Sequence, residues 1–215
     1  MDIAISAATD FELTFLKKGL INSHHNIRFH VSGVGLLAAT YAITELCHTT
    51  PDLIIQTGLA GTYRADLNLG ECVIVEQEIL GDTGAEHFDE HIDLFDMELL
   101  SKNNFPFQDK KLNNPYLQSE FKLPEKHIIG CTVCNSSGNE TTAYKRKTKF
   151  NADIESMEGA ALHYTCLIKQ IPFVQFRGIS NIAGQRDKSF WKISEAMYAF
   201  TDSICRFVSN IKTLQ

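Results

Sequence analysis

Two glutamates follow short apolar runs, at positions where a carboxylate could act on a bound ligand. Glu12 comes one short turn after the run over residues 2–7, and Glu158 opens an expected helix in Glu155-Ser-Met-Glu-Gly-Ala-Ala161. A glutamate can take a proton from an attacking water or accept hydrogen bonds from hydroxyl groups. Both residues also have a structural interpretation, because Thr9-Asp-Phe-Glu12 fits a helix capping box and the helix dipole favours any carboxylate in a first turn.

Two glycine-bearing turns and one asparagine also follow expected strands. The turns are Ser32-Gly-Val-Gly35 and Thr57-Gly-Leu-Ala-Gly61, and their glycines, Gly58 among them, can let a ligand approach the backbone. Neither turn has the spacing of a dinucleotide-binding or Walker motif, so each can equally be a tight strand-to-helix turn. Asn181 ends Arg177-Gly-Ile-Ser-Asn181, where it could contact a polar ligand or simply form a turn.

Strands and helices alternate along the chain, and they must bring these residues together. Apolar runs of four to eight residues predict strands over 2–7, 27–32, 53–57, 71–78, 127–133 and 173–179. Helical periodicity predicts helices over 9–19, 34–47, 141–149, 157–169 and 194–212. The alternation predicts an α/β fold, a single domain over 1–215 built as a three-layer sandwich whose mixed, mostly parallel central sheet is flanked by helices. Ligands of such sheets bind at the carboxyl ends of the strands.

The least regular stretch, residues 80–124, is rich in Asn, Asp, Gly and Pro. A long irregular insertion in an α/β domain is more often a lid or binding loop than a linker, so we expect it to border the site. By contrast, the run Lys145-Arg-Lys-Thr-Lys149 predicts a solvent-exposed helix face.

Composition argues against several classes of function. The chain has 215 residues with 20 Lys and Arg against 26 Asp and Glu, and this net charge of −6 would repel a nucleic acid backbone. No apolar run approaches the ~18 residues that span a bilayer, and no signal peptide is evident, so we expect a cytoplasmic protein without a membrane partner. His87 and His91 do not fit H-E-x-x-H, and the six cysteines suggest no zinc site, so no metal and no cofactor is expected.

Taken together, these segments resemble the nucleoside phosphorylase and nucleosidase superfamily over nearly the whole chain. The most specific match is Glu155-Ser-Met-Glu-Gly-Ala-Ala161 followed by Arg177-Gly-Ile-Ser-Asn181, with the glycine turns in support. Within the superfamily, Gly81-Asp-Thr-Gly-Ala-Glu86, Asp93-Leu-Phe-Asp96 and Trp191 are most similar to the futalosine hydrolases, which release hypoxanthine from futalosine in menaquinone biosynthesis. The resemblance therefore implies a purine nucleosidase whose partner is a small nucleoside.

The resemblance also implies roles for individual residues. Glu12 matches the general base, Glu158 the ligand of the ribose hydroxyls, and Met157 a residue that packs against the sugar. The other matched substrate-binding positions are Gly58, Thr132 and Val133, of which the last two flank the base. Asn181 replaces the Asp of adenine-cleaving nucleosidases, and a neutral amide that both donates and accepts suits a 6-oxopurine.

Water is the expected nucleophile, because Gln56 and Leu59 stand where superfamily phosphorylases contact phosphate, and Leu59 offers no polar group to that anion. Arg186 or Lys188 is the candidate cation for the benzoate of futalosine. Two alternatives stay open: a methylthioadenosine/adenosylhomocysteine-type nucleosidase and a purine nucleoside phosphorylase. Superfamily hydrolases are typically dimers, so a homodimer or higher homo-oligomer is expected.

Overall fold

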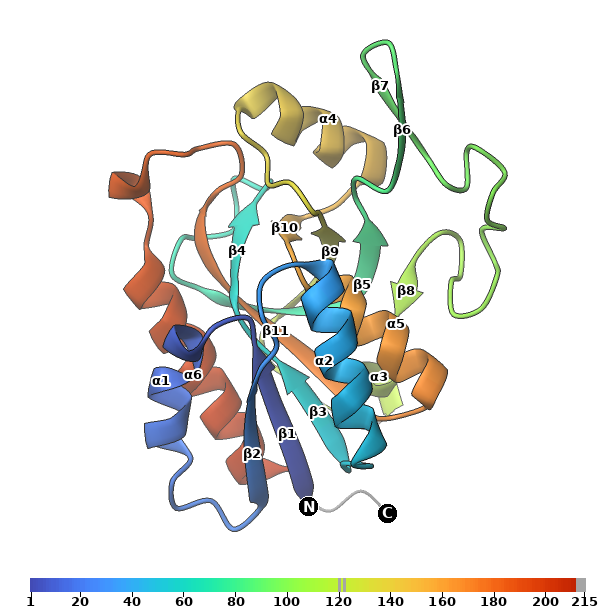
Figure 1. Ribbon diagram of the computed structural model, residues 1–215. Coiled ribbons are helices and arrows are strands. Elements are labelled where there is room, and N and C mark those ends of the chain that lie inside the picture. The colour runs from blue at the N-terminus through green and yellow to red at the C-terminus, as the bar shows by residue number, and fades with distance from the viewer. Residues whose placement is uncertain (120, 122, 212–215) are drawn as a thin grey trace.

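The computed structural model describes residues 1–119, 121 and 123–211, and in this part of the chain nine strands form one sheet (Figure 1). These strands are β1 (Asp2–Ala7), β2 (Asn26–Val31), β3 (Leu53–Gln56), β4 (Leu59–Thr62), β5 (Cys72–Leu80), β8 (Leu112–Asn113), β9 (Lys126–Thr132), β10 (Ile154–Ser156) and β11 (Phe173–Ile182). The helices are α1 (Asp10–Gly19), α2 (Leu36–His48), α3 (Tyr116–Ser119), α4 (Glu140–Phe150), α5 (Gly159–Lys169) and α6 (Ile193–Asn210).

The sheet runs in the order β2-β1-β3-β11-β4-β10-β9-β5-β8 and has two parts. From β2 to β11 all neighbours are parallel. Beyond β11 the sheet is mixed, because β10 runs antiparallel to β4 and β5 runs antiparallel to β11. Since β5 pairs with β11 as well as with β9, the strands β11, β4, β10, β9 and β5 close into a ring. The predicted mixed α/β sheet is confirmed, and the closed ring is an addition to it.

Helices cover both faces of the parallel part, as the alternation of side chains along β1 requires. Ile3 and Ile5 pack with residues of α1 and α6, whereas Ala4, between them, packs with residues of α2 and α5. Figure 1 shows α1 beside α6 and α2 beside α5 in two separate layers. The predicted three-layer sandwich is therefore confirmed.

Some short elements were not predicted. Thr57-Gly-Leu-Ala-Gly61 connects β3 to a second strand, β4, so our interpretation of it as a possible strand-to-helix turn is wrong. Both β4 and β10 are too short to show a periodic pattern and form by pairing with longer neighbours. The expected end of the last helix, Lys212, lies outside the described residues. None of the helices in the described part is long and apolar enough to cross a membrane.

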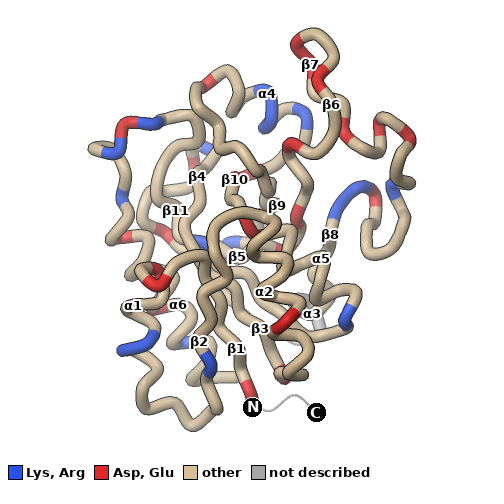
Figure 2. The backbone as a smooth tube through the Cα atoms, viewed as in Figure 1, with Lys and Arg blue, Asp and Glu red and all other residues tan. Residues whose placement is uncertain are grey.

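The irregular stretch contains a hairpin, β6 (Gly84–His87) and β7 (Glu90–Asp93), that faces helix α4. In Figure 2, Lys and Arg residues of α4 and acidic residues of the hairpin gather at the same end of the molecule. Lys145 donates to the Asp89 carbonyl at 2.8 Å, and Lys149 lies 2.6 Å from the Asp96 carboxylate just beyond the hairpin. The prediction of a wholly solvent-exposed helix face is wrong in one respect, because the Arg146 side chain is only 13% exposed.

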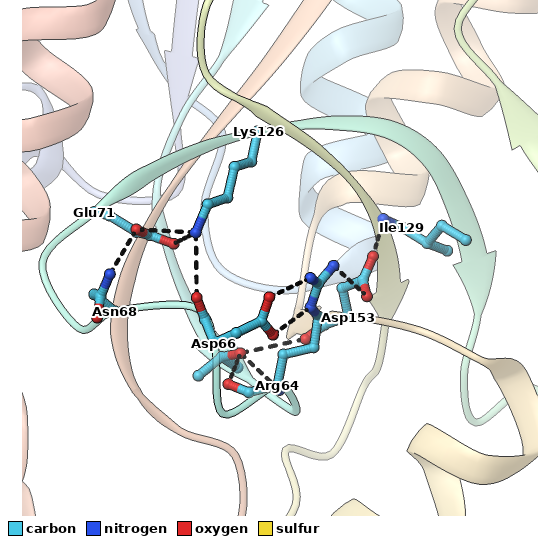
Figure 3. A network of polar contacts seen from close by, with 8 residues as sticks. Arg64, Asp66, Asn68, Glu71, Lys126, Ile129 and Asp153 are labelled. Carbon is cyan, nitrogen blue, oxygen red and sulfur yellow. Dashed lines mark hydrogen bonds and ion pairs between the residues drawn. The ribbon is translucent and has the colours of Figure 1, made fainter.

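A polar network fixes the connection from β4 to β5 at the start of β9 and β10 (Figure 3). Arg64 bridges the carboxylates of Asp66 and Asp153, at 2.9 and 3.2 Å, and Asp153 accepts the Ile129 amide at 2.8 Å. Lys126 joins the same connection by donating to Glu71 at 3.1 Å. The network therefore fastens this connection to two strands of the ring.

Candidate active site

Three of the predicted site residues, Glu12, Gly58 and Glu158, come together at the turn between β3 and β4. A Cβ atom on Gly58 would lie 3.0 Å from Glu12 Oε1 and 2.7 Å from Arg177 Nη1. Arg177 Nη1 in turn lies 3.5 Å from Glu158 Oε2. The structure therefore joins Glu12, Gly58 and Glu158 through Arg177, and glycine at position 58 is required because any side chain would displace the two charged groups.

Glu12 serves as a helix cap and also presents an oxygen to this turn. Its Oε2 accepts hydrogen bonds from the Thr9 amide at 3.0 Å and the Thr9 hydroxyl at 2.7 Å, which confirms the capping box. Its Oε1 accepts from the Leu59 amide at 3.2 Å and points at Gly58. Since only 9% of the residue is exposed, Glu12 is held in one orientation by groups from two elements.

Glu158 is the N-cap residue of α5, and α5 itself begins at Gly159. Its Oε1 accepts from the Gly35 amide at 3.0 Å, so the first glycine turn is brought to the second carboxylate. Its neighbour Met157 is half-buried on the same short turn after β10. The two glycine turns and the two glutamates thus form one assembly at the carboxyl ends of β1, β3 and β10, although they are far apart in sequence.

Arg177, a residue without a predicted role of its own, organises the assembly. Only 1% of it is exposed, and Nη2 donates to Gln56 Oε1 at 2.9 Å. The Gln56 amide nitrogen points to the Glu158 carbonyl at 3.4 Å, so Gln56 is occupied by internal contacts. The sequence contains a signal for this role of Arg177. Gln175 and Arg177 alternate with apolar residues in a strand whose length and composition predict burial on both faces, so their polar groups need buried partners.

Asn181 lies in β11 next to an irregularity in the pairing with β4. The Ser180 hydroxyl donates to its Oδ1 at 2.8 Å, and its Nδ2 donates to the Ile182 carbonyl at 2.9 Å. An amide nitrogen carries two hydrogens, so Nδ2 retains one more donor after this bond. The hydroxyl of Ser180 therefore fixes which side of the Asn181 amide is the donor, and one of the two Nδ2 hydrogens remains for a ligand.

Thr132 is the last residue of β9 and Val133 follows it, and both side chains are buried. The Thr132 hydroxyl donates to Glu78 Oε2 at 2.9 Å and accepts the Ala160 amide at 2.8 Å, which leaves it no free hydrogen. Val133 is fully buried in a cluster with Cys131 and other apolar residues. The prediction that both residues flank a base therefore depends on their backbone and on the turn that follows them.

Two carboxylates hold that turn, residues 134–137. Asp82 accepts the amides of Cys134 and Asn135 at 2.8 and 2.9 Å, and Glu155 accepts the Ser137 amide at 2.9 Å. Arg146 lies 3.4 Å from Asp82 and 3.5 Å from Glu155, so α4 braces the turn. An open cleft of about 840 Å³ lies beside it, between the β6–β7 hairpin and α4, so the irregular stretch borders this turn.

The remaining candidate residues are those of the segment after β11 and the two histidines of the hairpin. The Arg186 guanidinium lies 5.5 Å from the centre of the Trp191 ring, and both Arg186 and Lys188 are on the surface. His91 packs edge-on against Phe150. In the part of the chain that the structure describes, no group of three or more His, Cys, Asp or Glu residues could hold a metal ion.

Comparisons with known proteins identify a family and relatives of this chain. A family model described as the phosphorylase superfamily matches residues 15–212. The chain is 29% identical over 184 residues to a protein named futalosine hydrolase from Thermus thermophilus, covering 83% of this chain and 79% of the relative. It is 30% identical over 176 residues to a 5′-methylthioadenosine/S-adenosylhomocysteine nucleosidase from Tolumonas auensis, covering 77% of this chain and 72% of the relative.

Solved structures give the same fold. A 5′-methylthioadenosine/S-adenosylhomocysteine nucleosidase from Colwellia psychrerythraea in complex with adenine superimposes with a TM-score of 0.80, covering 100% of this chain and 97% of the other. The two sequences are 20% identical, so the likeness concerns the fold.

Proposed function

Because the chain belongs to the phosphorylase superfamily, we propose that it is a purine nucleosidase that hydrolyses futalosine to hypoxanthine and dehypoxanthine futalosine, a step of menaquinone biosynthesis. The general assignment to nucleosidases is supported by relatives of two nucleosidase types at 29% and 30% identity. The observation that carries the proposal is the meeting of Glu12, Arg177 and Glu158 around Gly58, since this arrangement can activate a water beside a bound sugar.

Glu12 is the proposed general base. Its Oε1 and Arg177 Nη1 both lie within 3.0 Å of the position that a Cβ on Gly58 would take. A water at this turn could donate a proton to the carboxylate and accept a hydrogen bond from the guanidinium, which would aim its lone pair at C1′ of the ribose. General bases of this kind contribute about 10²–10⁴-fold to a rate.

Glu158 is the proposed ligand of the ribose hydroxyls. The transition state of glycoside cleavage carries positive charge on the sugar, so a carboxylate at the hydroxyls lowers its energy. The Gly35 amide and Arg177 hold this carboxylate before substrate arrives, which reduces the reorganisation needed during the reaction. Met157, half-buried on the same turn, is placed to pack against the sugar.

Asn181 is the proposed contact to the departing base. The Ser180 hydroxyl holds its Oδ1, so Nδ2 can donate to O6 or N7 of hypoxanthine as negative charge develops on the purine. A hydrogen bond to a charged group is worth about 1.5–3 kcal/mol, which is enough to favour one purine over another. This preference supports futalosine over an adenine nucleoside.

The contacts of Gln56 and Leu59 support water over phosphate as the nucleophile. Gln56 is occupied by Arg177 and the Glu158 carbonyl, and Leu59 contributes only its amide, which Glu12 accepts. Burying a phosphate without paired donors would be costly. A methylthioadenosine/adenosylhomocysteine-type nucleosidase is the second candidate, because the relative from Tolumonas auensis bears that name.

The homodimer also stays a prediction. Apolar side chains on α2 and α5, which pack side by side, are exposed and would suit contact with a second copy. They are Leu37, Tyr41, Tyr164 and Ile168.

One assay tests the proposal: release of the free base from futalosine, inosine and methylthioadenosine, each with and without phosphate. We expect futalosine to be the best substrate, with the same rate in both conditions and a free sugar product. A sugar 1-phosphate would identify a phosphorylase, and preferred release of adenine would favour the second candidate.

A further inference from the structure

A carboxyl group lies buried below the site and has no part in the reaction described above. Glu78, in β5, has no exposed surface. A Cβ on Gly159 would lie 1.8 Å from Glu78 Oε1, so the start of α5 leaves room for this carboxyl group. Its Oε2 accepts from the Thr132 hydroxyl, which accepts the Ala160 amide two residues after Glu158. Glu78 therefore touches the helix start that carries the sugar-binding carboxylate.

The hydrogen bonds between Glu78, Gln175 and His163 require one additional proton. The positions of the heavy atoms do not show which of these residues carries it. Gln175 Nε2 lies 2.9 Å from Glu78 Oε1, and the other side of the Gln175 amide lies beside His163. His163 Nδ1 lies 3.0 Å from the Leu112 carbonyl, which can only accept, so Nδ1 carries the hydrogen of the neutral ring. His163 Nε2 and Gln175 Oε1, both buried, then lack a donor among the described residues.

One proton satisfies every group in this row, and it can sit at either end. A charged His163 would donate to Gln175 Oε1, while Gln175 donates to an ionised Glu78. Alternatively, the oxygen and nitrogen of the Gln175 amide exchange places. A neutral Glu78 acid then donates to Gln175 Oε1, and Gln175 Nε2 donates to His163 Nε2. Both arrangements leave no buried polar atom of the row unpaired, which is the usual condition of protein interiors.

The surroundings place the proton on Glu78. Burial raises the pKa of Glu78 to about 7 and lowers the pKa of His163 to about 4. The other charged or titratable groups packed around the row are Arg177 from β11 and Cys131 from β9. Arg177 disfavours a charged His163. Gln175 and Arg177 also lower the pKa of Glu78, but burial has the larger effect and raises it. Burial holds the pKa of Cys131 well above its usual range, so this thiol is neutral.

We propose that Glu78, Gln175 and His163 share one buried proton held by Glu78, and that the neutral Glu78 acid is a positioning residue for Glu158. The second part rests on the proposed role of Glu158 as the ribose ligand. Arg177 has a buried Nε with no partner among the described residues, so an ionised Glu78 would compete with Glu158 for the guanidinium. Loss of the proton would therefore loosen the carboxylate that binds the sugar.

The variant E78Q tests both parts, because a glutamine can donate to Gln175 and accept from Thr132 as the neutral acid does. E76Q is the matched control, since Glu76 lies in the same strand with a partly exposed side chain. Infrared difference spectra between acidic and alkaline pH should show the carbonyl band of a buried carboxylic acid in wild type and E76Q and lack it in E78Q. No substrate is needed, so failure of the proposed function would not affect this result.

Kinetics test the positioning part. With futalosine, kcat/KM of wild type and E76Q should fall about tenfold between about pH 6.5 and about pH 8.5, as Glu78 ionises. E78Q should keep the activity seen at the lower pH across this range. E78M, which fills the space without hydrogen bonds, should be about tenfold or more below wild type at about pH 6.5 and should show no further fall toward about pH 8.5. An infrared band unchanged by E78Q would overturn the shared proton, and equal alkaline falls in wild type and E78Q would overturn the positioning role.

Discussion

Replacing Glu12 by glutamine separates the two roles that the structure gives this residue. The third position of a capping box accepts Glu or Gln, so the E12Q side chain can still bind the Thr9 amide. Its amide nitrogen would then face the Leu59 amide and Arg177, where the wild type presents Oε1. We expect the free energy of unfolding to fall by only about 1 kcal/mol, the value of one hydrogen bond. By contrast, kcat/KM for base release should fall about 10²–10⁴-fold.

T9A is the matched perturbation, because it removes the capping hydroxyl and leaves Glu12 Oε1 on the Leu59 amide. Loss of a cap costs about 0.5–2 kcal/mol, and 1 kcal/mol shifts the melting temperature of a chain of this size by about 2–4 °C. T9A should therefore melt about 3 °C lower while its rate stays within about tenfold of wild type. Calorimetry and steady-state hypoxanthine release measure both quantities. If E12Q keeps most of its activity and melts as low as T9A, the capping box is the whole role of Glu12.

Three further predictions follow from the same contacts. N181D should lower hypoxanthine release at least about tenfold and gain activity on the 6-amino analogue, because a carboxylate repels O6, and equal use of both nucleosides by wild type would contradict this. G58A should fold but lose about 10²-fold or more in kcat, since its Cβ would meet Glu12 and Arg177, and a near-normal kcat would refute the arrangement. Burial raises the pKa of Glu78 to about 7 from its ordinary value of 4.5, so between these two pH values the folded protein holds a proton that the unfolded chain has lost. The free energy of unfolding of wild type, relative to that of E78Q, should therefore fall by about 3 kcal/mol as pH rises from about 4.5 to about 7. Urea unfolding across this range measures it, and a difference independent of pH would contradict it.

The sequence by itself determined the parallel half of the sheet and one end of the site. Strands β1 and β3 are buried on both faces, so they appear as mostly apolar runs that need no partner to be recognised. Strand β11 is also buried on both faces, and apolar residues surround Gln175 and Arg177 in its sequence. The capping box of α1 is equally local, because its donors and acceptors lie within four residues. The positions of Glu12, Glu158 and Asn181 at strand ends follow from the same patterns.

Only the tertiary structure decided how the site is held together. Strands β4 and β10 have four and three residues and exist because longer neighbours supply their hydrogen-bond partners. The contacts that fix the charged groups join residues 97 to 123 positions apart: Glu78 with Gln175, Arg177 with Gln56, and Glu158 with Gly35. A local pattern cannot specify such pairs. Arg177 and Glu78 interrupt apolar strands, which the sequence shows, but the groups that compensate their burial are known only once the chain has folded.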